Sequence, residues 1–395
     1  MQFEANQKVD KFNPGSSKSF VLIIKIMFLF GVDVKTDAKF PGYKFSKWRS
    51  AYQGFVALLW MLYFIYTALS VIIIDLPSVT RISEVLPRKS SDVLAFMIWC
   101  VLKTRKRKIY HLLCDIFYLS NNFKVKCRPL WLSFGPVIIL GIPVLGWQAL
   151  TWFFEEDDCR KLIPYLTFGF RYVREGQNCK VFSFATLLQV IASKSLKLAF
   201  TVLYIFLCCL IRKILITHST AGVNIFAIQA PMLDYKYFKR YLAGYDSIIE
   251  VLKSFERIMS LPILLVQLYD CMNIFYGIVN LDPIKELSQN NIIAKYFTGI
   301  VFVSSVSLTS FLCVCFAATN IHEASKRARD VQERIFKRII TSEPGTGREQ
   351  MVLLFLNCNN PAFALSASGF FYFTKPMILA AIGSIVTYSL LVMQF

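Results

Sequence analysis

Apolar stretches of about 20 residues recur along this chain, and they restrict its fold more than any other feature. A helix rises about 1.5 Å per residue, so a stretch of about 20 residues crosses a hydrocarbon core of roughly 30 Å. Hydrophobic residues make up 55% of the 395-residue chain, and charged residues make up 17%. The chain is therefore predicted to be an all-α membrane protein. The predicted spans are 52–74, 93–102 with an upstream extension, 130–154, 182–211, 258–279, 296–318 and 376–395.

The chain is strongly basic, with 44 Lys and Arg against 25 Asp and Glu. In a soluble protein this excess would suggest nucleic acid as a partner. Here the basic residues gather in alternate connecting segments, namely 1–51, 103–128, 212–257 and 319–370. Segments of this kind stay in the cytosol. We therefore expect about seven transmembrane helices with a cytosolic N-terminus and an extracellular C-terminus, and anionic membrane lipids as partners instead of nucleic acid.

The predicted organisation has four parts. Residues 1–50 form a cytosolic N-terminal segment, in which the apolar run 20–30 is interrupted by Lys25 and is typical of an interfacial or cytosolic helix. Residues 51–318 hold helices 1–6, which form a sensing bundle. Residues 319–370 form cytosolic anchor helices, because charges recur at helical spacing over 319–340 and a second amphipathic stretch follows at 350–357. Residues 371–395 hold helix 7.

Ionisable and amide side chains occur inside two predicted spans. Lys194 and Lys197 lie three residues apart in the fourth span, and Gln267, Asp270 and Asn273 recur at the same spacing in the fifth. Such groups are costly at membrane depth and usually face a cavity or a partner. Three readings stay open: a cavity shared by the two helices, an ion pair between Asp270 and one lysine without a ligand, and lysines that reach the outer interface.

Common enzyme motifs are missing from the sequence. It contains no G-x-x-x-x-G-K-[ST], G-x-S-x-G or H-E-x-x-H pattern, and its three histidines have no cysteine at zinc-site spacing. The acidic run 155–158 is typical of a solvated loop rim. We expect no enzymatic activity, no metal and no cofactor. Cys159 and Cys179 share a predicted outside loop, and the sequence leaves open whether they form a disulfide.

The last span places four residues on one face. Gly383, Thr387, Leu390 and Gln394 follow spacings of four, three and four. A glutamine at the outer end of this helix needs water or another polar group. In a symmetric oligomer it would meet its own copies around an axis and form a gate. Ordinary helix packing, with the glutamine among lipid headgroups, explains the pattern equally well.

The C-terminus also carries a resemblance. Thr387-Tyr388, five further residues and Gln394-Phe395 resemble the terminal signature of insect gustatory receptors. Segments 45–50, 260–265, 360–361 and 369–374 resemble parts of the sugar-receptor branch of that family. Ser389 departs from that branch, which usually has an acidic residue after the Thr-Tyr pair.

The resemblance implies a gustatory receptor that acts as a tastant-gated, non-selective cation channel, with a sugar as one candidate ligand. It implies a homotetramer, or a heteromer with related receptors, in the cell membrane of chemosensory neurons. The last helix would line the pore. The candidate ligand-binding residues are Trp147, Gln148, Trp152, Gln189, Gln267, Asp270 and Asn273, and the candidate pore residues are Thr387, Leu390, Leu391, Gln394 and Phe395.

Two other functions remain as alternatives. A seven-helix G-protein-coupled receptor requires an extracellular N-terminus, which the basic N-terminal segment argues against. A secondary transporter could use Lys194, Lys197 and Asp270 as a coupling site, although the internal repeats common in transporters are not found in the sequence.

Overall fold

The structure is a computed structural model, and it describes residues 18–34, 47–75, 82–125, 130–151, 180–228, 235–279, 291–341, 348–357 and 362–394. These residues are almost entirely helical. The helices are α2 (Lys18–Leu29), α3 (Lys47–Ser70) with its π-helical extension η2 (Val71–Asp75), α4 (Ile82–Asn122), α5 (Leu130–Thr151), α7 (Lys180–Ile228), α8 (Tyr235–Val279), α9 (Asn291–Thr341), α10 (Arg348–Asn357) and α11 (Lys375–Gln394). A short antiparallel hairpin, β1 (Ser366–Ala367) and β2 (Phe371–Tyr372), precedes α11.

Within the described residues, each predicted span lies in a helix, and the all-α prediction is confirmed. By length and composition, four helices of the described chain could cross a membrane, at Lys47–Ile73, Thr186–Asn224, Phe238–Val279 and Thr298–Arg338. Two shorter apolar helices lie at Phe134–Ala149 and Lys375–Tyr388. The predicted second span belongs to α4, which also contains the basic run 103–108 and is therefore less apolar over its length.

Several helices extend well beyond the predicted spans. The sixth span and the solvated helix expected after it form one continuous helix, α9. The helices α4, α7 and α8 likewise run on into the basic segments. Hydropathy falls in these segments while the helical spacing of apolar residues continues, so a prediction based on hydropathy ends the helices too early.

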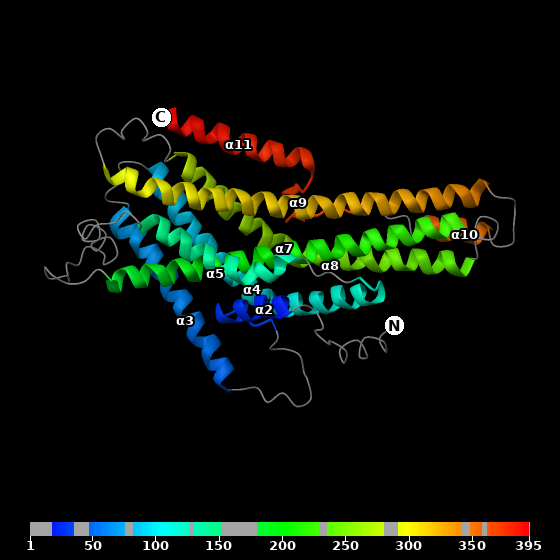
Figure 1. Ribbon diagram of the computed structural model, residues 1–395, viewed down its shortest axis with the longest axis horizontal. Coiled ribbons are helices and arrows are strands. Elements are labelled where there is room, and N and C mark those ends of the chain that lie inside the picture. The colour runs from blue at the N-terminus through cyan, green and yellow to red at the C-terminus, as the bar shows by residue number, and fades with distance from the viewer. Residues whose placement is uncertain are drawn as a thin grey trace.

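The helices are arranged around α7, α8 and α9. In Figure 1, α9 runs along the length of the molecule with α7 and α8 beside it. The helix α4 packs against α8, and α5 packs against α7 and α9. The helix α11 lies towards the end of the molecule where α9 begins, whereas α10 lies at the opposite end (Figure 1). The helix α2 is docked on α5 and α7, with Ile23 and Met27 fully buried.

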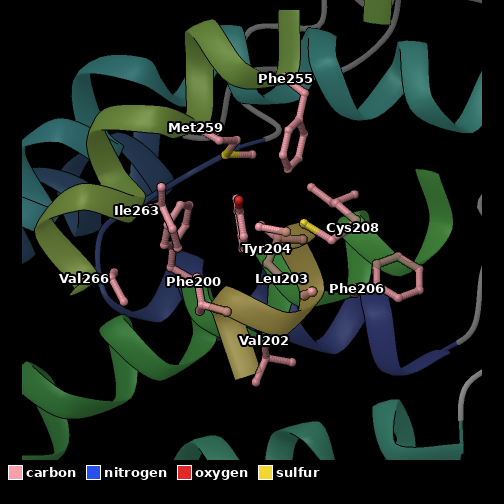
Figure 2. Packing of buried hydrophobic residues seen from close by; sticks show 14 of the residues in the cluster. Phe200, Val202, Leu203, Tyr204, Phe206, Cys208, Phe255, Met259, Ile263 and Val266 are labelled. Atoms are coloured by element: carbon pink, nitrogen blue, oxygen red, sulfur yellow. The ribbon is translucent and has the colours of Figure 1, made fainter. Parts of the chain in front are cut away.

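Large apolar side chains fill the space between α7 and α8. Figure 2 shows Phe200 and Tyr204 of α7 beside Met259 and Ile263 of α8. The ring centroids of Tyr204 and Phe255 lie 5.4 Å apart. All of these side chains are buried, so the two long helices are held together along much of their length.

A second, smaller core joins the predicted anchor helices. It is formed where α8, α9 and α10 meet, at the end of the molecule away from α11. The rings of Phe336 in α9 and Phe355 in α10 stack with centroids 3.9 Å apart. The buried members are Phe238, Tyr241, Leu242, Val331, Ile335 and Phe355.

Arg105 of α4 compensates for a proline inside α8. Pro262 has no backbone N–H, so the carbonyl of Ile258, four residues earlier, loses its helical hydrogen bond. The Nη1 of Arg105 donates to the Ile258 carbonyl over 2.7 Å and to the Arg257 carbonyl over 3.1 Å. A guanidinium from one helix therefore satisfies carbonyls of the other.

Replacing Arg105 is expected to destabilise the protein. Arg105→Met should cost about 1.5 to 3 kcal/mol, because it removes charge-assisted hydrogen bonds and leaves the Ile258 carbonyl without a donor. Adding Pro262→Ala should recover part of this loss, since alanine restores the N–H. Thermal melting of the purified protein measures both effects. Lys108→Met, at an exposed position of the same helix, is the control; equal melting temperatures for the two single variants would contradict the role of Arg105.

Candidate functional site

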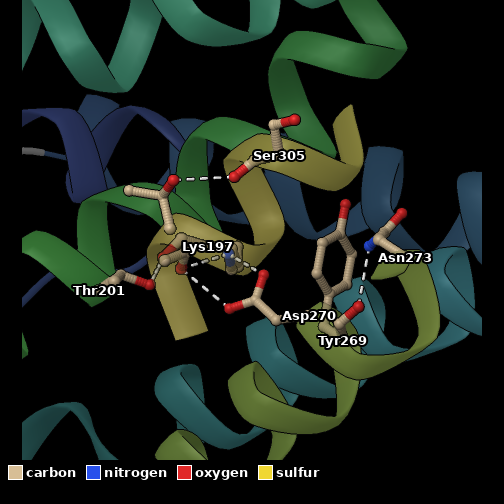
Figure 3. Close-up of polar contacts among 8 residues, drawn as sticks. Lys197, Thr201, Tyr269, Asp270, Asn273 and Ser305 are labelled. Carbon is tan, nitrogen blue, oxygen red and sulfur yellow. Dashed lines mark hydrogen bonds and ion pairs between the residues drawn. The ribbon is translucent and has the colours of Figure 1, made fainter. Parts of the chain in front are cut away.

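A buried ion pair joins α7 and α8 in the middle of the bundle. The Nζ of Lys197 lies 2.5 Å from Oδ1 of Asp270, and both side chains are almost completely buried (Figure 3). The Lys197 ammonium also donates to the Ser310 hydroxyl over 2.8 Å, and that hydroxyl donates to Oδ2 of Asp270 over 2.8 Å. Three helices, α7, α8 and α9, thus contribute to one closed network.

This network bears on two of the three interpretations of the buried charges. The interhelical ion pair between Asp270 and a lysine is confirmed. The idea that both lysines reach the outer interface is wrong for Lys197, because its ammonium is held by Asp270 inside the bundle. Removing charges from water is costly, and the hydroxyl of Ser310 helps to offset that cost.

A small cavity lies directly beside the ion pair, between α5, α7, α8 and α9. Its volume is about 30 Å³, which is enough for a water molecule. Its polar wall contains Lys194 and Lys197, the ring of Tyr269, and Ser307. The apolar lining residues are Ile142, Gly146, Leu198, Phe302, Val303 and Val306. The cavity therefore combines apolar surface with a few convergent polar groups, at a size that holds a water molecule in this arrangement.

Lys194 is the second lysine of the cavity wall. Asp92 of α4 attracts it electrostatically, while the Asp92 carboxylate accepts a hydrogen bond of 2.7 Å from the Tyr63 hydroxyl. Within the described ranges, no protein atom accepts a hydrogen bond from the Lys194 ammonium. The sequence allowed a cavity shared by the fourth and fifth spans. Such a cavity is present beside the ion pair, and α7 contributes both of its lysines.

None of the candidate ligand-binding residues is among the described residues that line this cavity. Gln267, Asp270 and Asn273 are buried in α8. The Gln267 amide oxygen is 3.5 Å from the Cys315 thiol, and the Asn273 amide donates to the Tyr269 carbonyl over 2.8 Å. Their roles in ligand binding stay predictions.

The remaining candidate ligand-binding residues differ in their burial and in their hydrogen bonds. The Trp147 indole in α5 donates to the Thr186 hydroxyl over 3.3 Å, whereas the neighbouring Gln148 is exposed. Gln189 of α7 is half-buried. Trp152 lies outside the described residues, as do Cys159 and Cys179.

Sequence reasoning missed the contribution of α9. Ser304, Ser307 and Ser310 recur at intervals of three, so they share one face of the sixth span. Ser307 lines the cavity and Ser310 completes the ion pair. The same spacing that drew attention to the polar residues of the fifth span could have identified this serine stripe.

The helix α11 packs on α8 and α9 through one face only. Ile378 is buried on that face, whereas Leu379, Tyr388 and Leu390 are exposed to 74%, 65% and 52%. Thr387 and Leu391 are exposed as well. Gln394 is the last residue of α11, and Phe395 lies outside the described residues. The described chain therefore leaves a large apolar helix face without a protein contact of its own.

Polar contacts fix the segment that leads into α11. The Glu256 carboxylate accepts hydrogen bonds from the backbone N–H and the hydroxyl of Ser366 in the hairpin, over 3.2 Å and 2.5 Å. The Lys375 ammonium, at the first residue of α11, lies 2.6 Å from the Glu323 carboxylate of α9. The base of α11 is thus tied to both α8 and α9.

A second cavity lies behind α11. Its volume is about 300 Å³, and it is almost entirely apolar. Gly277 of α8, Ser304 and Ser305 of α9, and Ile382 and Ile385 of α11 are among its lining residues. In the described chain, no cluster of three or more His, Cys, Asp or Glu side chains could hold a metal ion.

Comparisons with known proteins agree on the kind of molecule. The fold is similar to the insect olfactory receptor OR5 from Machilis hrabei, with a TM-score of 0.66 and 12% identity over 95% of this chain and 97% of that chain. The same receptor in complex with eugenol gives a TM-score of 0.64 and 13% identity, over 95% and 97% of the two chains. At these identities the likeness establishes the fold alone. No curated protein matches the chain in sequence.

A sequence model of a protein family identifies the family of this chain. The model described as "7tm Chemosensory receptor" matches residues 23–395. This range runs from the middle of α2 to the last residue of the sequence, so it includes both the buried ion pair and α11. The chain belongs to the 7tm chemosensory receptor family.

Proposed function

We propose that this protein is a gustatory receptor that acts as a tastant-gated, non-selective cation channel. The observation that carries the proposal is the exposed apolar face of α11, including Leu379, Leu390 and Leu391. Lipid chains or another protein surface can cover such a face in a membrane. In the proposed channel, copies of the same helix from other subunits cover it around a central axis and form a pore.

The pore-lining face is proposed to include Thr387, Leu390 and Leu391, with Gln394 and Phe395 at its outer end. Apolar side chains that converge on an axis close a pore by excluding water, and polar ones admit hydrated ions. The channel is a homotetramer, or a heteromer with related receptors, and residues 319–370 anchor it on the cytosolic side. Residues 51–318 sense the ligand.

Ligand binding can reach α11 through α9. Phe302 and Ser307 of α9 line the cavity beside the ion pair, and Glu323 of the same helix holds Lys375 at the start of α11. A ligand that binds more tightly when α9 is displaced shifts the population towards the arrangement in which the last helices spread. The resemblance to the sugar-receptor branch makes sugars the first tastants to test.

The channel is proposed to lie in the cell membrane of chemosensory neurons, with its N-terminus in the cytosol. The basic segments 103–128 and 212–257 support this orientation, because basic loops remain on the cytosolic side. Epitope tags at the two ends should therefore stain differently in unpermeabilised cells: the C-terminal tag is accessible and the N-terminal tag is not. The reverse result would favour a G-protein-coupled receptor.

Electrical recording tests the channel itself. Cells that express the chain, alone or with a related receptor, should show a tastant-evoked current that reverses near zero voltage, as expected of a non-selective cation pore. Leu391→Ala should change the current at a fixed tastant concentration, whereas Leu29→Ala, at an exposed position of α2, should not. Substrate uptake without channel-scale current would favour the transporter instead.

A further inference from the structure

The polar groups in the wall of the cavity beside the ion pair are mainly hydrogen-bond donors. Among the described lining residues, Lys194 and Lys197 have ammonium groups, Tyr269 and Ser307 have hydroxyls, and none is Asp, Glu, Asn or Gln. The hydroxyls of a sugar donate as well as accept, so a sugar site needs side-chain acceptors. The lining supplies mainly donors, and it suits a ligand that carries a strong acceptor.

The two lysines are not equivalent. The Lys197 ammonium is used by the protein, because Asp270 and Ser310 accept its hydrogen bonds. The Asp270 carboxylate accepts hydrogen bonds from Lys197 and Ser310. It is therefore occupied within the protein and unavailable to a ligand.

The ammonium of Lys194 has N–H donors that could bind a ligand. An ammonium carries three N–H donors, and the described part of the chain provides none of them with an acceptor. Asp92 lies outside the cavity lining and attracts Lys194 only electrostatically. Lys194 is half-buried at the cavity wall, and an ionised acceptor placed in the cavity would form a short, charge-assisted hydrogen bond with its ammonium.

The rest of the described cavity lining is apolar. It includes Ile142, Val306 and Phe302. The Phe302 ring lies so close to Gly146 that a Cβ at that glycine would be 3.3 Å from it. At about 30 Å³ the cavity admits a carboxylate with its chain only when this ring turns away from Gly146. Phe302 belongs to α9, so such a ligand acts directly on the helix that holds the base of α11.

We propose that this cavity binds the carboxylate of a small aliphatic acid at Lys194, with the alkyl chain against Phe302, so that organic acids are the tastant class of this receptor. The inference rests on the proposed channel function and names the ligand of the same site. It replaces the sugar that the sequence resemblance suggested.

Binding to the purified full-length protein in lipid nanodiscs tests the inference. The probes are acetate, hexanoate and decanoate, each compared with its neutral amide, and glucose. At least one acid should raise the melting temperature more than its amide, and glucose should have no effect. Lys194→Met should weaken binding of that acid about tenfold or more, because one charge-assisted hydrogen bond is lost. Lys194→Arg should retain binding, and Lys108→Met should match the unmodified protein.

The outcomes separate the ligand class from the channel function. Equal stabilisation by acid and amide, unchanged binding in Lys194→Met, stabilisation by glucose alone, or no effect of any acid would each overturn the inference. If Lys194→Met fails to fold, two measurements still test the inference. They are the comparison of each acid with its amide on the unmodified protein and the binding of the acid to Lys194→Arg. A tastant-evoked current without acid binding would leave the channel proposal intact. Acid binding at Lys194 without a current from any tastant would support the proposed acid site and contradict the proposed channel function.

Discussion

Asp270→Asn is expected to destabilise the protein by about 3 to 5 kcal/mol, because it leaves the Lys197 ammonium buried without its counter-charge. Both side chains are nearly inaccessible to bulk solvent, so the lost counter-charge is not replaced by full hydration. The variant should melt at a lower temperature in detergent, and a smaller fraction should reach the cell surface. Replacing both members, in Lys197→Met with Asp270→Leu, should recover much of the loss, because no uncompensated charge remains.

An exposed ion pair serves as the matched control. Arg329 and Glu333 lie four residues apart on α9, with 3.0 Å between Nε and Oε1. Glu333→Gln should cost about 0 to 0.5 kcal/mol, since water solvates the arginine that remains. If Asp270→Asn lowered the melting temperature no more than Glu333→Gln, the ion pair inside the bundle would not contribute to stability.

Gly277→Val is expected to force α8 and α9 apart. A Cβ at Gly277 would lie 1.9 Å from the Ser304 hydroxyl oxygen and 2.6 Å from its Cβ, so even alanine requires one helix to shift. Overpacking of this kind costs about 1 to 3 kcal/mol, and valine should be at or above the upper end of that range. Both residues line the cavity behind α11, so the displacement should also weaken the contact of α11 with the bundle.

Two further variants check that explanation by melting temperature and surface delivery. Ser304→Gly should partly rescue Gly277→Ala, because it removes the atoms that the new methyl group meets. Gly54→Ala is the control, since nothing lies within 4 Å of a Cβ at that exposed position of α3. It should be neutral or slightly stabilising, as alanine is the better helix former. A Gly277→Ala protein as stable as Gly54→Ala would contradict the close packing of α8 on α9.

The sequence by itself determined the membrane class and the order of the helices. Apolar stretches of sufficient length and their basic flanks are local properties, so hydropathy locates them without knowledge of any contact. The spacing of Lys194, Lys197 and Asp270 offered a shared cavity or an ion pair between the fourth and fifth spans, with lysines at the outer interface as the alternative. Continuous helices such as α9 were harder to predict, because helical hydrogen bonding continues where hydropathy changes.

Only the tertiary structure decided which partner each buried group has. Lys194 and Lys197 lie on the same helix, three residues apart, yet Lys197 pairs with Asp270 and Lys194 faces a cavity. Contacts between helices depend on how each helix is rotated and displaced along its neighbour, and the sequence of one chain does not fix those quantities residue by residue. For the same reason, the capping of the Ile258 carbonyl by Arg105, 153 residues away in the sequence, has no local signal.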